Sequence, residues 1–142
     1  MIKDVILTKE KIIKVDSGDV MHAMKNSSRG FLDFGEAYFS SIKGNSIKAW
    51  KKHQKMTLNL IVPYGKVCFV VFDDRNDKKI FGKYIISNEN YYRLTVPPGL
   101  WLGFKGLHHP KSLILNIADI LHEDKEVEKI DIDAIEYNWS ME

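Results

Sequence analysis

The stretch that decides the fold is Lys43–Arg75, KGNSIKAWKKHQKMTLNLIVPYGKVCFVVFDDR. It predicts three short strands, at Ile47–His53, Thr57–Val62 and Lys66–Asp73, because β-branched and aromatic residues dominate each run. A Pro-Tyr-Gly turn follows the second strand. Proline fixes its own backbone angle and glycine adopts one that other residues avoid, so this turn reverses the chain.

Short apolar runs separated by turn residues also occur on both sides of this stretch. Further strands are predicted at Ile2–Leu7, Lys11–Val15, Phe31–Ser41, Tyr84–Ser87, Tyr91–Val96, Leu100–Phe104 and Ser112–Ala118. Val20–Lys25 fits either a strand or a single helical turn. Within Leu121–Ile135, the spacing of Val127 and Ile130 fits a short amphipathic helix, and Ile130 with Ile132 fits an edge strand. Tyr137 and Trp139 beyond it either pack on the barrel, pack on a second subunit or fray. Short strands without long helical periods predict an all-β fold, an antiparallel sandwich or barrel, as one domain over residues 1–142.

Composition narrows the function classes. The formal net charge of +2 over 142 residues gives no reason to expect a nucleic-acid partner. No apolar run is long enough for a membrane span, and the N-terminus does not resemble a signal peptide, so a cytoplasmic protein without a membrane partner is expected. The single cysteine, Cys68, lies in an apolar run and is expected to be buried. The histidine spacings fit no metal site, so neither a metal nor another cofactor is predicted.

The densest polar cluster lies on the predicted strand Ile47–His53 and just after it. Strict alternation would place Ala49, Lys51 and His53 on one face, with Lys48, Trp50 and Lys52 on the other, unless a bulge breaks the register. One interpretation is a barrel mouth lined with ammonium groups that suit phosphate or carboxylate. The other is a solvated edge strand whose lysines prevent pairing with another chain.

Three segments in order resemble the dTDP-4-dehydrorhamnose 3,5-epimerase family, the RmlC-like branch of the cupins. IKAWKKHQKMTLNLIVPYGKVCFVVFDDR resembles the strand pair around R-G-L-H that ends in D-x-R, and VPPGLWLGFKGL resembles I-P-x-G-x-x-H-G-F. LNIADILHEDKEVEKIDID resembles the closing strand and acidic tail. Epimerase-like proteins with K-G-W-H-x-H-K-x-x-T are more similar still in the first segment.

The resemblance implies a jelly-roll barrel, usually a homodimer, that binds a nucleotide-linked 4-keto sugar of the dTDP type in surface polysaccharide biosynthesis. Family members use a histidine base, a tyrosine acid and cationic side chains that hold an enolate. The family's arginine falls on Lys48, its base histidine on Lys51 and a second histidine on His53. Two further positions differ in kind, because Leu102 replaces a histidine and Ile120 lies where the acid tyrosine is expected.

Three hypotheses follow from these departures. The first is an epimerase or isomerase with altered catalytic residues, in which Lys51 or His53 is the base. The second is a catalytically silent cupin that binds a nucleotide sugar or a pathway partner, and the third is a purely structural barrel. For substrate binding, charge is expected from Lys48, Arg75 and Lys105, and stacking from Trp50, Tyr64 and Trp101.

Overall fold

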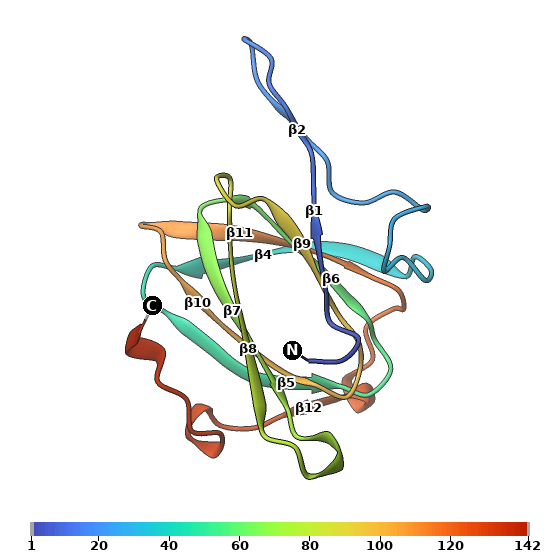
Figure 1. The fold of residues 1–142 in the computed structure, drawn as a ribbon, viewed down its shortest axis with the longest axis vertical. Coiled ribbons are helices and arrows are strands. Elements are labelled where there is room, and N and C mark those ends of the chain that lie inside the picture. The colour runs from blue at the N-terminus through green and yellow to red at the C-terminus, as the bar shows by residue number, and fades with distance from the viewer. Residues whose placement is uncertain (1, 142) are drawn as a thin grey trace.

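A computed structural model describes residues 2–141. Two five-stranded antiparallel sheets face each other (Figure 1). The first sheet has the order β1 (Ile6–Lys9), β9 (Tyr92–Val96), β6 (Leu58–Tyr64), β11 (Lys111–Ala118) and β4 (Glu36–Lys43). The second has the order β12 (Val127–Lys129), β5 (Ile47–His53), β10 (Trp101–Gly106), β7 (Lys66–Asp73) and β8 (Ile80–Ser87). The predicted all-β class and antiparallel sandwich are confirmed.

The chain crosses repeatedly between the two sheets, which is the origin of the jelly-roll architecture. The Pro-Tyr-Gly turn carries it from β6 to β7, and Gly65 there has a φ of 90°. Pro97-Pro98-Gly99 carries it from β9 to β10, and Gly99 has a φ of 89°. Since β6 and β9 are antiparallel neighbours, these two turns lie at opposite ends of the sandwich.

A separate two-stranded hairpin, β2 (Ile12–Ile13) with β3 (Val20–Met21), projects beyond the sandwich. The first of these strands begins within the predicted Lys11–Val15 run. The run Val20–Lys25, which fits either a strand or a helical turn, begins with a strand of two residues, Val20–Met21.

Side chains from both sheets fill one part of the sandwich. The buried cluster between the sheets includes Val62, Val67, Phe69, Ile86 and Leu94, each at most marginally exposed. Successive residues of β7 alternate between this interior and the outer face of the second sheet. Cys68, on the outward face, is fully buried as predicted because it lies in a second apolar cluster.

The C-terminal segment covers that outer face. It contains short 3-10 turns at Asp124–Glu126, Ile132–Ala134 and Trp139–Met141, together with the edge strand β12. An edge strand forms, but at Val127–Lys129 and not at Ile130 and Ile132, and no α-helix forms in 121–135. Trp139 is 8% exposed and its ring centroid lies 5.3 Å from that of Trp50. The two aromatic residues near the C-terminus pack on their own barrel.

Candidate functional site

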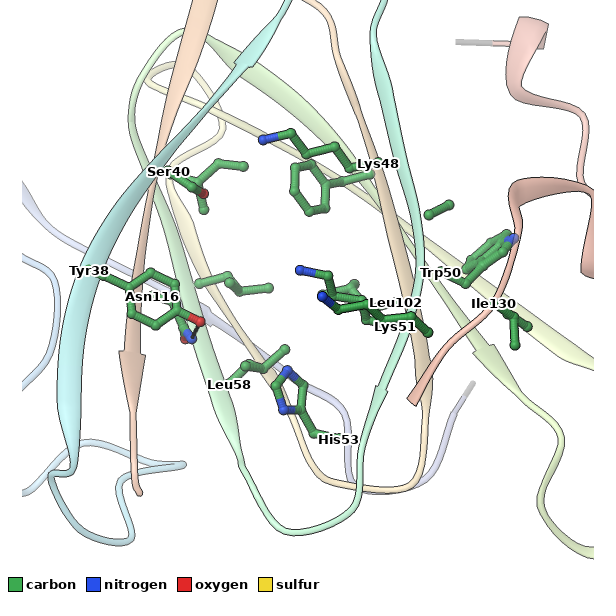
Figure 2. Close-up of a pocket in the computed structure, with 15 residues that line it drawn as sticks. Tyr38, Ser40, Lys48, Trp50, Lys51, His53, Leu58, Leu102, Asn116 and Ile130 are labelled. Atoms are coloured by element: carbon green, nitrogen blue, oxygen red, sulfur yellow. Dashed lines mark hydrogen bonds between the residues drawn. The ribbon is translucent and has the colours of Figure 1, made fainter. Parts of the chain in front are cut away.

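A cavity of about 450 Å³ opens between the sheets, where β4 and β11 face β5, β10 and β12. Its apolar lining comes mainly from Leu58, Leu60, Leu102, Phe104 and Ile114. Polar side chains lie on both sides of this lining, with Lys48, Lys51 and His53 on the second sheet (Figure 2). The interpretation of this strand as a solvated edge is therefore wrong, because β12 covers the edge and the polar side chains border a cavity.

A β-bulge brings Lys48 and Lys51 of β5 to the same side. In the register with β10, Lys51 pairs with Leu102 and Lys48 pairs with Phe104, so two residues of β5 lie opposite Gly103 alone. A Cβ atom at Gly103 would come within 2.7 Å of the Ala49 Cβ, which explains why this position lacks a side chain. Strict alternation therefore predicts the wrong face for Lys48. The extra residue shifts the alternation by one position, so Lys48 faces the cavity together with Lys51.

His53 is held by a carboxylate from the C-terminal segment. Its Nδ1 lies 2.5 Å from Oε1 of Glu126, and the two side chains are 11% and 2% exposed. The other oxygen, Oε2, accepts hydrogen bonds from the backbone amides of Gln54 at 2.9 Å and Lys55 at 3.0 Å. A carboxylate can only accept, so Nδ1 carries the proton and Nε2 is left free to accept one.

The pKa of Glu126 supports this protonation state. Burial alone raises the pKa of a carboxyl group, but hydrogen bonds from His53 and from the amides of Lys55 and Met56 bring the pKa of Glu126 below its usual value. Glu126 is therefore ionised at neutral pH. The arrangement orients the imidazole and leaves Nε2 available to accept a proton, as a general base requires.

Three lysines surround the cavity: Lys48, Lys51 and Lys129. Burial in the cavity lowers the pKa of Lys51, and the charges of Lys129 and Lys48 lower it further, although Lys51 still reaches solvent at the mouth. Within residues 2–141, neither Lys51 nor Lys129 has a carboxylate partner. Uncompensated ammonium groups of this kind suit an anionic ligand.

The opposite wall of the cavity also carries hydroxyl and amide groups. Tyr38 and Ser40 project from β4, and Asn116 projects from the neighbouring β11. Asn116 donates a hydrogen bond of 3.0 Å from Nδ2 to the Tyr38 hydroxyl. Ile120, where the resemblance places an acid tyrosine, does not line the cavity and packs against the main core instead.

Trp50 is among the residues that line the cavity, but its indole points into the outer aromatic cluster (Figure 2). The other predicted binding residues lie outside the lining. Trp101 belongs to the same cluster and donates from Nε1 to Asp74, and Lys105 donates to the carbonyl of Trp139. The last two predicted binding residues, Arg75 and Tyr64, have partners outside the cavity.

Arg75 pairs with Asp73, with Nε 2.9 Å from Oδ1, and Tyr64 is 56% exposed with its ring against His108. The structure brings Lys48, Trp50, Lys51 and His53 to one cavity and leaves Tyr64, Arg75, Trp101 and Lys105 outside its lining. The polar strand lies at the cavity, whereas the two prolyl turns and the D-x-R strand end lie outside it.

Sequence reasoning missed the cavity residues that come from distant parts of the chain. Glu126 and Lys129 lie in the acidic tail, to which the sequence assigned no role, and Tyr38 lies in the predicted strand Phe31–Ser41 without a role of its own. A signal for Tyr38 was present, because Tyr38, Ser40 and Ile42 share one face of a strand. Nothing local indicates that Asn116 lies beside it, since that contact depends on the pairing of β4 with β11.

Comparison with known proteins places this architecture. A solved structure, the dTDP sugar isomerase from Desulfovibrio desulfuricans G20, is 30% identical and superposes with a TM-score of 0.92 over 97% of this chain and 92% of that one. The dTDP-4-dehydrorhamnose 3,5-epimerase from Sulfolobus tokodaii shares the fold at 19% identity, with a TM-score of 0.80 over 94% of this chain and 80% of that one. The chain belongs to the dTDP-4-dehydrorhamnose 3,5-epimerase family.

Curated relatives of this RmlC-like chain carry related names. The probable low-salt glycan biosynthesis epimerase Agl13 of Haloferax volcanii is 29% identical over 103 residues, which span 68% of this chain and 66% of that protein, just under two thirds. The spore coat polysaccharide biosynthesis protein SpsL of Bacillus subtilis is 28% identical over 148 residues, 90% of this chain and 98% of that protein. No family model matches the sequence.

The same fold also occurs with a different reaction. QdtA, a sugar 3,4-ketoisomerase from Thermoanaerobacterium thermosaccharolyticum, superposes with a TM-score of 0.74 at 18% identity, covering 94% of this chain and 93% of that one. Fold therefore does not distinguish epimerisation from a keto shift, and that question depends on the residues of the cavity.

Within residues 2–141, no group of three or more His, Cys, Asp or Glu side chains is placed to hold a metal ion. No helix in that range is both long and apolar enough to cross a bilayer.

Proposed function

We propose that this protein is a sugar-nucleotide epimerase or isomerase that acts on a nucleotide-linked 4-keto sugar of the dTDP type in polysaccharide biosynthesis. The observation that carries the proposal is the His53–Glu126 pair at a cavity bordered by lysines. The names of the relatives support the reaction class. The proposal includes a homodimer, which rests on the family resemblance alone.

The chemistry begins at a carbon next to the keto group. Nε2 of His53 removes a proton from that carbon, and Glu126 stabilises the imidazolium that results. The negative charge that develops on the keto oxygen needs nearby cations, and Lys48 and Lys51 border the same cavity. Because the leucine-lined walls are apolar, these charges act through a lower effective dielectric than in bulk water.

The lysines have a second task in substrate binding. A nucleotide-linked sugar carries a diphosphate, and ammonium groups at the mouth of the cavity match its charge. Lys51 is assigned to charge stabilisation and His53 to proton removal, because only His53 has a carboxylate that orients it. Leu102 pairs with Lys51 in the register and presents no proton-transfer group.

Hydrogen exchange in D2O tests the proposal. The protein is incubated with several dTDP-linked 4-keto hexoses, and proton NMR follows the hydrogens next to the keto group against an enzyme-free sample. We expect deuterium uptake by the native protein and a loss of about 100-fold or more in His53→Gln. The matched control is His122→Gln, whose exposed ring contacts Asp124 outside the cavity, and it should exchange like the native protein.

Absence of exchange with every sugar tried would defeat the proposal. A rise in melting temperature with dTDP in that case would identify a binding protein without catalysis, which is the second hypothesis. The two outcomes are separate measurements on one preparation, so binding and proton transfer are assessed independently.

A further inference from the structure

The cavity has polar groups on two facing walls. His53 comes from β5 of the second sheet, whereas Tyr38 comes from β4 of the first sheet. Figure 2 shows both side chains directed toward the space between the sheets. A sugar ring bound in that space therefore has the imidazole on one side and the phenol on the other.

The hydrogen bonds around Asn116 fix which way the tyrosine proton points. Asn116 is 3% exposed, and its Oδ1 accepts from the backbone amide of Asn59 at 3.1 Å. Its Nδ2 must then face Tyr38 and donate to the phenol oxygen at 3.0 Å. Because that oxygen already accepts a hydrogen bond, the hydroxyl's own proton is free for a different acceptor.

The pairing of β4 with β11 fixes the contact between Tyr38 and Asn116. Tyr38 and Asn116 are direct cross-strand partners in the β4–β11 register, so their side chains emerge side by side on the face toward the cavity. Tyr38 is 40% exposed, which leaves its hydroxyl accessible from the mouth, whereas the amide that holds it is buried. The buried amide of Asn116 therefore fixes the position of the Tyr38 phenol at the mouth of the cavity.

We propose that Tyr38 is the proton donor on the wall opposite His53 and that Asn116 is its positioning residue, so that the protein inverts a carbon instead of shifting the keto group. This inference rests on the proposed function. It replaces the acid expected near Ile120 with a hydroxyl from a different strand, and it selects epimerisation from the two reaction types that the fold accommodates.

The proton balance of the step is complete without another reactant. His53 takes the proton as the C–H bond breaks, and the electron pair passes into the enolate. The Tyr38 O–H bond then breaks, and a new C–H bond forms on the same carbon from the opposite face. Solvent returns a proton to the phenolate and takes one from the imidazolium. A single base without Tyr38 returns its proton to the face it came from, which retains the configuration.

The test compares inversion with exchange in the same D2O experiment. Native protein should give inverted product with one deuterium at each inverted carbon. Tyr38→Phe should lose inversion by about 100-fold or more while hydrogen exchange with retention continues through His53. Asn116→Ala should lower the ratio of inversion to exchange by roughly 10-fold, an effect that a purely structural role would not produce.

Tyr92→Phe is the matched control, because Tyr92 lies on β9 and does not line the cavity; it should behave like the native protein. Thermal unfolding confirms that each variant is folded. Native inversion with unchanged inversion in Tyr38→Phe would overturn the assignment of Tyr38. Exchange without inversion in the native protein, or a shifted keto group, would overturn the inference and leave the proposed function standing. No exchange with any sugar would overturn both.

Discussion

On the outer side of β5, Trp50 is 1% exposed among aromatic rings, whereas on the inner side Lys48, Lys51 and His53 border an open cavity. The usual pattern for a strand in a two-layer protein has apolar residues inside and polar residues outside. Here the order is reversed, because the C-terminal segment covers the outer face and the interior is not filled at this end. The comparison shows that one strand separates a packed aromatic cluster from an open cavity lined with polar side chains.

The largest expected effect is on the outer side. Trp50→Ala should lower the free energy of unfolding by about 3–5 kcal/mol, because it removes a buried indole that packs on Trp139 and donates to the carbonyl of Ile132 at 3.2 Å. Denaturant unfolding measures this loss. Phe39→Ala, at a side chain that is 63% exposed, should change it by less than about 0.5 kcal/mol. Similar losses in both variants would refute the assignment of this cluster to the core.

The next effect concerns the inner side. Glu126→Gln removes the charge that holds His53 and weakens the hydrogen bonds to the turn after β5, so it should lower the free energy of unfolding by about 1–3 kcal/mol. It should also reduce deuterium uptake more than stability alone explains. Glu128→Gln is the control, because Glu128 lies on the exposed side of β12. Normal deuterium uptake with a folded Glu126→Gln variant would show that the carboxylate has no role in proton transfer.

A smaller effect is the pH dependence of that carboxylate. Because the pKa of Glu126 in the folded protein is below its ordinary value of 4.5, its contribution is fully present above that pH. The contribution is lost as the pH falls through the lower folded value. The stability difference between native protein and Glu126→Gln should therefore be constant near neutrality and shrink in acid. A difference that grows in acid would contradict the lowered pKa.

The smallest effect is expected when a positive charge is removed from the cavity side of β5. Lys51→Met should raise the free energy of unfolding by at most a few tenths of a kcal/mol, since solvent screens the repulsion from Lys48 and Lys129. The folded protein holds the Lys51 proton less tightly than the unfolded chain, so native stability should rise slightly as the pH approaches 10.5 from below. The same variant should bind dTDP more weakly. Tighter dTDP binding would contradict the role of the lysines.

The predicted fold depended on local patterns that the structure retains. Ile47–His53 and Lys66–Asp73 are strands with the predicted bounds, because each is a continuous run between turn residues. Phe31–Ser41 was shifted, since its first residues form a loop and the strand begins at Glu36. Strand bounds follow from composition, but the partner of each strand does not.

The candidate site was predicted only where it lies on one strand. Lys48, Lys51 and His53 share β5 and were identified together, although the bulge opposite Gly103 was needed to align them. Glu126 is 73 residues from His53 and Asn116 is 78 residues from Tyr38, so those contacts arise from tertiary pairing. Conversely, Trp101 and Lys105 have suitable chemistry but face the outer cluster and the C-terminal segment.

The partner of His53 arrives late in the chain. Within residues 2–141, β12 is the one strand that follows Glu126 in the sequence. The segment that begins at Glu126 therefore has two structural tasks, because it supplies the carboxylate that orients the imidazole and then continues into the residues that cover the outer face. A change that loosens this segment should disturb the inner and the outer side of β5 together.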